Sequence, residues 1–175
     1  MKALILGAAA AAFLHITPTV TLVERSEVVS RLLTGADRFT AREIHLSSSD
    51  ERRLHDAAGW TPPDDVITFY LGKRANQVEG VLVFMRVDSP HGPLEVAVGF
   101  DKAGVIRGVE VTKATVETKP WIVEALRAGL TTQYRTTPEA APGIKGKVGT
   151  MAQYMAELID RGVAHAGAAY RLFYR

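Results

Sequence analysis

Four closely spaced runs of β-branched and aromatic residues constrain the fold of this chain more than any other feature of its sequence. They are VITFYLGKR (66–74), VEGVLVFMRVDS (78–89), LEVAVGFD (94–101) and VIRGVEVTKA (105–114). Residues of this type are enriched in strands. Turn-forming residues lie between the runs, at 73–76, 89–92 and 101–104. Parallel neighbours need crossover connections of a dozen or more residues, so these short intervals predict an antiparallel meander.

Segments on both sides of the meander predict further elements. A helix is expected over 26–35, with Ser26 as a possible N-cap, and a strand over 38–46. Ser48 and Glu51 fit a capping box at the start of a short helix that ends at Gly59. Two more helices are expected over 119–130 and over about 150–169. Together these elements indicate an α+β fold, with an antiparallel sheet of about four to five strands flanked by N-terminal and C-terminal helices.

Size and composition narrow the classes of function. A chain of 175 residues is long enough for one domain with a real core. Its net charge is only +2, and the basic residues are interspersed with acidic ones, which argues against nucleic acid as a partner. The chain has no cysteine, so disulfides, thiolate zinc sites and iron–sulfur clusters are excluded.

The N-terminal segment indicates export. A single Lys2 precedes an apolar run over 3–14, which is typical of a secretory signal. No clear Ala-x-Ala cleavage site follows, so a retained membrane anchor is the second interpretation, and a buried first helix of a cytoplasmic protein is the third. We therefore assign residues 1–23 to a signal peptide or membrane anchor, here called the leader, and 24–175 to a folded domain. The expected location is the periplasm or the periplasmic face of the inner membrane.

Catalytic and metal-binding motifs are not found in the sequence. It contains no nucleotide P-loop, no Gly-x-Ser-x-Gly and no His-Glu-x-x-His. The five histidines, at positions 15, 45, 55, 91 and 165, are far apart and have no partner at metal-ligand spacing. We accordingly predict no catalytic residue and no metal ligand.

The junction between a glycine-containing loop and the last helix is the strongest candidate for a ligand site. Gly143, Gly146 and Gly149 allow the backbone to bend closely around a ligand. A helix that begins near Thr150 presents unpaired N–H groups and the positive end of its dipole, and both favour a phosphate. The alternative interpretation is that Thr150 is simply the N-cap of the helix.

Three further side chains, two in this loop and one in the preceding helix, have two interpretations each. Lys145 and Lys147 would attract a phosphate through their charge, or they are solvated loop residues. Trp121 would stack on a planar cofactor, or it holds its helix against the sheet.

From about residue 26 onward the chain resembles the periplasmic FMN-binding domain family. This family includes the flavin subunits of the sodium-pumping quinone reductase and of the Rnf electron-transport complexes. The resemblance rests on the order of elements and on three stretches of sequence: EVAVGFDKAGVIRGVEVTKATVET, KVGTMAQ and AELIDRGVAHAGAAYR. The attachment motif is degenerate, because Lys147-Val148-Gly149 replaces the Ser-Gly-Ala that precedes the threonine in the family.

The resemblance implies a cofactor and a set of site residues. In the family a separate flavin transferase attaches FMN through its phosphate to the threonine hydroxyl, which corresponds here to Thr150, beside Gly149 and Lys147. Glu117 and Thr118 match the Glu-Thr near the flavin, and Trp121 lies close by in the sequence. The chain would then be an exported electron-transfer module rather than a self-contained enzyme, with membrane-bound electron-transfer subunits as partners. The alternative is a flavin-free structural or docking subunit of such a membrane complex.

Overall fold

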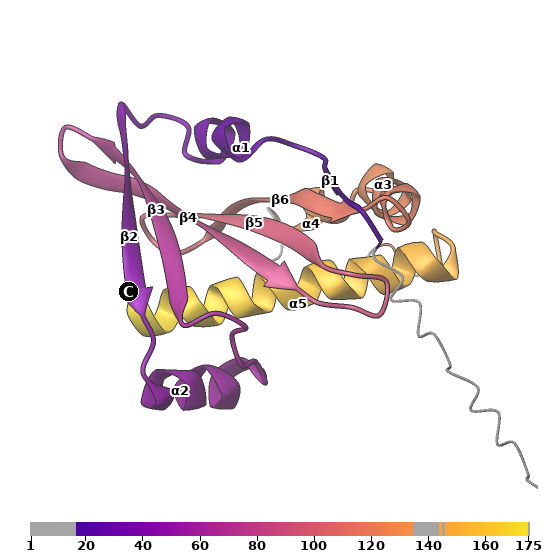
Figure 1. Cartoon of the computed structure of the whole chain (residues 1–175). Helices are drawn as coiled ribbons and strands as arrows, with labels where there is room; N and C mark the ends of the chain where they lie inside the picture. The colour runs from indigo at the N-terminus through magenta and orange to yellow at the C-terminus, as the bar shows by residue number, and fades with distance from the viewer. Residues whose placement is uncertain (1–16, 135–143, 145, 175) are drawn as a thin grey trace, which may run out of the picture.

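Six antiparallel strands form a single sheet. The computed structural model describes residues 17–134, 144 and 146–174 of the chain. The strand order across the sheet is β1-β6-β5-β4-β3-β2 (Figure 1). The strands are β1 (Thr19–Thr21), β2 (Arg38–His45), β3 (Val66–Arg74), β4 (Gln77–Val87), β5 (Leu94–Asp101) and β6 (Ile106–Thr115).

The predicted meander is confirmed, and the sheet has six strands where four to five were predicted. Strands β3 to β6 pair consecutively, and β2 pairs with β3 over its whole length. The unexpected strand is β1, in which Thr19 pairs with Thr115 and Thr21 with Lys113 of β6. This strand lies within 1–23, so the sheet extends further toward the N-terminus than the sequence indicates. Three residues are too few to show strand periodicity in the sequence.

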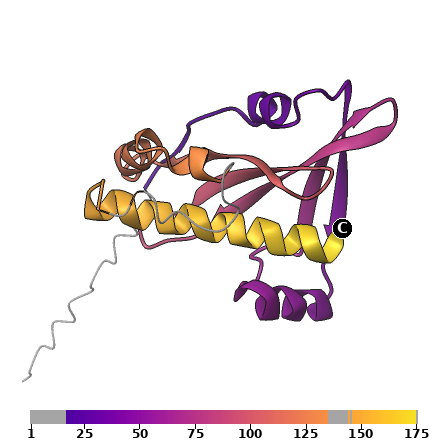
Figure 2. The ribbon, with the colours of Figure 1, turned by 180° about the vertical axis from the view of Figure 1, so that it is seen from behind.

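Helices cover the two faces of the sheet unequally. They are α1 (Arg25–Leu32), α2 (Ser48–Ala58), α3 (Lys119–Arg127), α4 (Leu130–Gln133) and α5 (Thr150–Phe173). Helix α5 runs across one whole face, and the short α1 lies over the opposite face (Figures 1 and 2). Both α2 and α3 pack against α5. The class of the fold is therefore α+β, as the sequence predicts.

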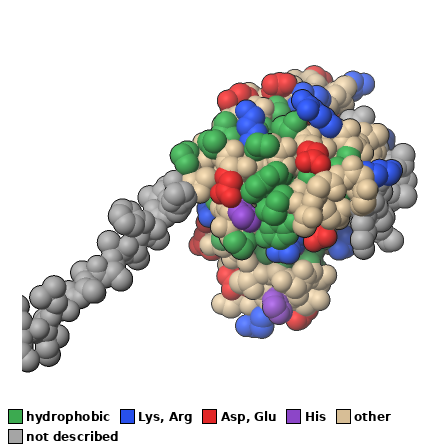
Figure 3. All heavy atoms as spheres, turned by 90° about the vertical axis from the view of Figure 1, so that its right-hand side faces the viewer, with side chains coloured by type: hydrophobic (Ala, Val, Ile, Leu, Met, Phe, Trp, Pro, Cys, Tyr) green, Lys and Arg blue, Asp and Glu red, His purple; other side chains and the backbone are tan. Residues whose placement is uncertain are grey.

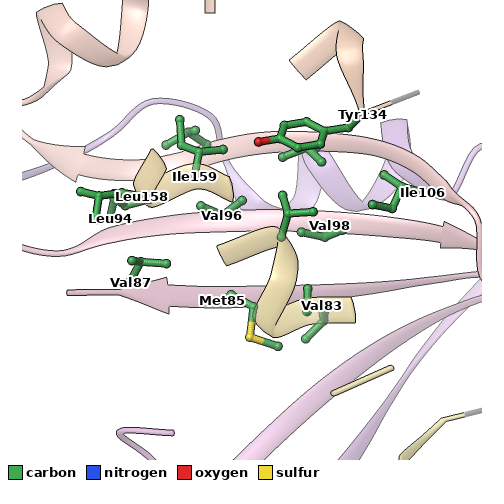
Figure 4. Close-up of a cluster of buried hydrophobic side chains, with 14 of the residues drawn as sticks. Val83, Met85, Val87, Leu94, Val96, Val98, Ile106, Tyr134, Leu158 and Ile159 are labelled. Atoms are coloured by element: carbon green, nitrogen blue, oxygen red, sulfur yellow. The ribbon is translucent and has the colours of Figure 1, made fainter. Parts of the chain in front are cut away.

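The main hydrophobic core lies between the sheet and α5. Inward side chains of β4 and β5 meet Leu158 and Ile159 of α5 (Figure 4). On the other face a smaller cluster joins α1 to the sheet, and it consists of Val28, Leu32, Leu33, Leu82 and Ala97. Because burial of apolar surface is the main stabilising term, the α5 face contributes most of the stability of the domain.

One glycine sets the distance between α5 and the sheet. A Cβ atom at Gly162 would lie 3.0 Å from Val96 Cγ2 and 3.1 Å from Val87 Cγ2. Such distances are shorter than ordinary van der Waals contacts between carbon atoms. Gly162 therefore allows the middle of α5 to approach β4 and β5 closely.

The helix ends differ in detail from the sequence predictions. Helix α1 has Glu24 as its N-cap instead of Ser26. The capping box of α2 is formed by Ser47 and Asp50, one residue before the predicted pair. Helix α2 ends at Gly59 in the left-handed conformation, with φ of 61°, as expected.

The N-terminal assignment falls mainly outside the described part of the chain, because residues 1–16 are not described. Among the described helices, none combines the length and hydrophobicity needed to cross a membrane.

Candidate functional site

Helix α5 begins at Thr150, and its N-cap is Gly149. The first intrahelical hydrogen bond runs from the Gln153 N–H to the Gly149 carbonyl, at 2.9 Å. Thr150 is therefore the first helical residue, and the interpretation of its side chain as the N-cap is wrong. Gly149 has no side chain to cap the helix, and the Thr150 side chain is exposed. The N–H groups of the first helical turn have no acceptor within the helix.

A carboxylate from a neighbouring helix contacts this helix start. The Gly149 N–H donates a hydrogen bond to Glu124 Oε1 of α3, at 2.7 Å. An anionic group at this position interacts favourably with the positive end of the helix dipole. The first turn of α5 contains no acidic residue of its own, so Glu124 supplies the negative charge there.

Three ring side chains, here called the aromatic cluster, lie beside the helix start. They are His91, Trp121 and Tyr154. The His91 ring lies edge-on to both other rings, with centroid distances of 5.3 Å to Trp121 and 6.1 Å to Tyr154. All three side chains are half-buried. Figure 3 looks onto this end of the molecule, where hydrophobic side chains adjoin a histidine and acidic side chains.

Glu117 joins the aromatic cluster through a polar contact with the His91 ring. Its Oε1 atom lies 3.1 Å from His91 Nδ1, and the Glu117 side chain is exposed. The two residues of the predicted Glu-Thr pair therefore differ in exposure. Glu117 faces solvent beside the aromatic cluster, and Thr118 is buried.

Thr118 is buried and has a structural role. Only 3% of it is exposed, and its hydroxyl lies 2.9 Å from the hydroxyl of Thr115. The N–H of Thr118 donates to Thr115 Oγ1, and the N–H of Thr115 donates to Thr118 Oγ1, both at 3.2 Å. These reciprocal bonds fix the connection from β6 to α3. Glu117 lies in this connection, and Trp121 lies in the first turn of α3.

The remaining predicted residues differ in exposure. Trp121 is half-buried and packs against the main core, so the structure supports its predicted role in holding α3 to the rest of the domain. Lys147 is exposed in the turn before α5. Gly143 and Lys145 lie outside the described residues.

A chain of contacts brings these residues together at one end of the molecule. Tyr154, one turn after Thr150, contacts His91, and His91 contacts Trp121. Glu124, nearly one turn after Trp121, contacts Gly149. Residues separated by three or four positions lie on the same face of a helix. The contacts between α3 and α5 therefore bring Trp121 and Glu124 close to the start of α5, and the residues that precede these helices lie at the same end. Lys147 lies two residues before Gly149 in the turn that leads into α5.

Sequence reasoning missed His91, Glu124 and Tyr154. The position of His91 could have been inferred from the meander, because the start of β5 lies beside the end of β6, as the pair of Glu95 with Lys113 shows. His91 precedes β5 and Glu117 follows β6, so the same pairing brings them close together. Glu124 and Tyr154 belong to helices whose packing no local pattern specifies.

Comparison with protein-family models, with curated proteins and with solved structures finds no match for this chain. Among the described residues, no group of three or more acidic or histidine side chains is placed to hold a metal ion.

Proposed function

We propose that this protein is an exported, membrane-associated flavoprotein module that transfers electrons through FMN bound near Thr150. The observation that carries the proposal is the start of α5. There an exposed threonine hydroxyl, uncapped helical N–H groups and an aromatic cluster lie together. A phosphate is stabilised at such a helix start by N–H donors and by the helix dipole.

The residues at this end fit the parts of FMN in different ways. The Thr150 hydroxyl would form the phosphoester with the FMN phosphate, made by a separate flavin transferase. Lys147 would add positive charge beside the phosphate. The half-buried rings of Trp121 and Tyr154 offer apolar surface to the flavin ring system. FMN itself would supply the one- and two-electron chemistry, while the protein sets access and potential.

Glu124 imposes a condition on this proposal. Its carboxylate accepts the Gly149 N–H, which is one of the donors that a phosphate would use. Two anions at one helix start repel each other, so FMN attachment requires the Glu124 side chain to move away from Gly149. Glu124 is exposed, and an exposed side chain can change rotamer without disrupting a packed core.

The test is flavin incorporation by the full chain co-expressed with a flavin transferase and exported. After denaturation we expect flavin fluorescence, and we expect an added FMN mass on the peptide that contains Thr150. Thr150→Ala should abolish both signals, whereas Thr132→Ala, which alters another exposed threonine, should leave them unchanged. A flavin that dissociates on denaturation would indicate reversible binding instead of attachment.

The contact between Glu124 and Gly149 favours a second candidate function. The Gly149 N–H already has a carboxylate acceptor, and the charge of Glu124 stabilises the helix dipole without a ligand. The domain would then be a flavin-free structural or docking subunit of a membrane electron-transfer complex. An unmodified mass after co-expression, together with co-purification of membrane subunits from the native host, would support this function over the first.

A further inference from the structure

His165 lies in the middle of α5, far along the helix from Thr150. Here a groove of about 450 Å³ opens between the connection from α2 to β3, the end of β4 and the middle of α5. We call it the His165 groove, and its main lining residues are Trp60, Thr61, Arg86, Asp88, Arg161 and His165. Its volume falls in the range of small-molecule sites.

The imidazole of His165 is held in one orientation. Only 6% of the residue is exposed, and its ring stacks on the Trp60 ring with a centroid distance of 4.7 Å and an interplanar angle of 10°. Its Nδ1 atom is buried and has no hydrogen-bond partner in the described part of the chain. The other ring nitrogen, Nε2, is not fully buried. It is therefore the nitrogen that reaches the groove.

The burial of Nδ1 determines which nitrogen carries the hydrogen. A buried N–H without an acceptor is costly, so the neutral ring places its hydrogen on Nε2. Burial and the positive charge of Arg161 lower the pKa of His165 to about 4. The ring is therefore neutral near pH 7, and its Nε2–H is a donor that faces the groove.

The groove is lined by two positively charged side chains and one negatively charged side chain. On β4 and just after it, Arg86 Nε pairs with Asp88 Oδ1 at 2.9 Å. Arg161 on α5 forms no ion pair with any described residue, and its side chain is exposed. The groove thus combines one uncompensated guanidinium with a neutral N–H donor.

We propose that the His165 groove binds a small anion, a phosphate or carboxylate group, between the Arg161 guanidinium and the Nε2–H of His165. Arg161 supplies charge-assisted hydrogen bonds, which are the stronger kind, and the stacked rings of Trp60 and His165 form a rigid wall. The site is separate from the start of α5. His165 lies fifteen positions after Thr150 on the helix, which corresponds to roughly 22 Å.

Anion binding and protonation of His165 are linked. A bound anion compensates the charge of Arg161, which is one of the two causes that lower the pKa of His165. The pKa of His165 therefore rises when the anion binds, and by reciprocity the anion binds more tightly as the pH falls toward that pKa. The other charged groups that line the groove are Arg86 and Asp88, which pair with each other.

The experiment is an NMR titration of the isotopically labelled full chain. Inorganic phosphate and succinate are the probes, with sodium chloride added to keep the ionic strength constant. We expect saturable shifts of the Trp60 indole and His165 ring signals, and a higher His165 pKa at saturation. Arg161→Gln should weaken binding about ten-fold or more. Arg127→Gln, which changes an exposed arginine on α3, should leave it unchanged.

Several outcomes would overturn the proposal. They are shifts that grow linearly without saturation, equal affinities in the wild type and Arg161→Gln, or a His165 pKa that does not change with the probe. Because Arg161 is exposed, its variant is expected to fold, and far-UV circular dichroism checks this. Tighter binding of phosphate than of succinate would identify a phosphorylated ligand, and the reverse order a carboxylate.

Discussion

The two candidate sites lie on the same helix but differ in how firmly their residues are held. At the start of α5 and beside it, Thr150, Glu117 and Glu124 are exposed, so a change of rotamer does not disturb the core. In the His165 groove, Trp60 and His165 are buried and stacked on each other. The exposed residues of the first site can rearrange around a ligand at little cost to the fold, whereas the stacked rings of the second are buried and fixed.

Because of this difference, the two sites need different measurements. Substitutions at an exposed site change stability little, so its function is detected through ligand attachment. Substitutions at a buried site change stability and its dependence on pH, because burial couples the charge of a group to folding. The charges also differ, because carboxylates adjoin the start of α5 and an uncompensated arginine adjoins the groove.

The largest expected difference in stability between the two sites is at their tryptophans. Trp60 is 8% exposed, and Trp60→Ala would leave a cavity against His165 and the main core. We expect a loss of about 3–5 kcal/mol in the free energy of unfolding. Trp121→Ala removes a half-buried ring and should cost about 1–2 kcal/mol. Urea denaturation of both variants measures the difference, and equal losses would contradict the assigned burial.

The second prediction concerns pH. The pKa of His165 is about 4 in the folded chain and has its ordinary value of 6.5 when unfolded. Between these values the unfolded chain binds a proton that the folded chain does not, so stability falls as the pH drops from 6.5 to about 4. His165→Phe should flatten this part of the stability curve. His55→Gln, a change at an exposed histidine, should leave the pH dependence of stability unchanged. If His165→Phe also leaves it unchanged, His165 is not the cause of the loss of stability at low pH.

The third prediction tests the buried hydrogen bonds beneath the first site. Thr118→Val keeps the volume of the side chain but removes the hydroxyl that contacts Thr115. We expect a loss of about 1–2 kcal/mol, because the Thr115 N–H loses its acceptor. Thr132→Val, at an exposed position, is the control. A loss no larger than in the control would show that these bonds do not stabilise the connection to α3.

The smallest effect is expected at Glu124. Glu124→Gln keeps an oxygen that can accept the Gly149 N–H but removes the charge beside the helix dipole. The loss should be about 0.3–1 kcal/mol at low salt and should shrink at high salt, where exposed charges are screened. Glu43→Gln on β2 is the matched control. A loss that is independent of salt would show that charge is not the cause.

Local patterns in the sequence predicted much of the fold, because strands, turns and helix ends depend on residues that are close together in the chain. Short intervals between hydrophobic runs required antiparallel pairing, and Gly59 marked the end of α2. The capping box was placed one residue late because Ser47 and Asp50 have the same spacing and chemistry as Ser48 and Glu51. Strand β1 was missed because three residues carry no periodicity and lie in the range assigned to the leader.

The candidate sites were only partly predictable, because their contacts join distant parts of the chain. Thr150 and the five other predicted residues were identified from local motifs and a family resemblance, and they lie at one end of the molecule. The contact of Glu124 with Gly149 depends on how α3 packs against α5, and the stacking of Trp60 on His165 depends on how α2 and its connection pack against α5. No periodicity encodes such packing.

The most direct test of the central claim is the intact mass of the exported chain after co-expression with a flavin transferase, for the wild type, Glu124→Gln and Thr150→Ala. We predict one added FMN group on the wild type, at least equal incorporation in Glu124→Gln, and none in Thr150→Ala. An unmodified mass in both the wild type and Glu124→Gln would contradict the flavoprotein proposal. It would leave the start of α5 as a helix end whose nearest anionic group is Glu124.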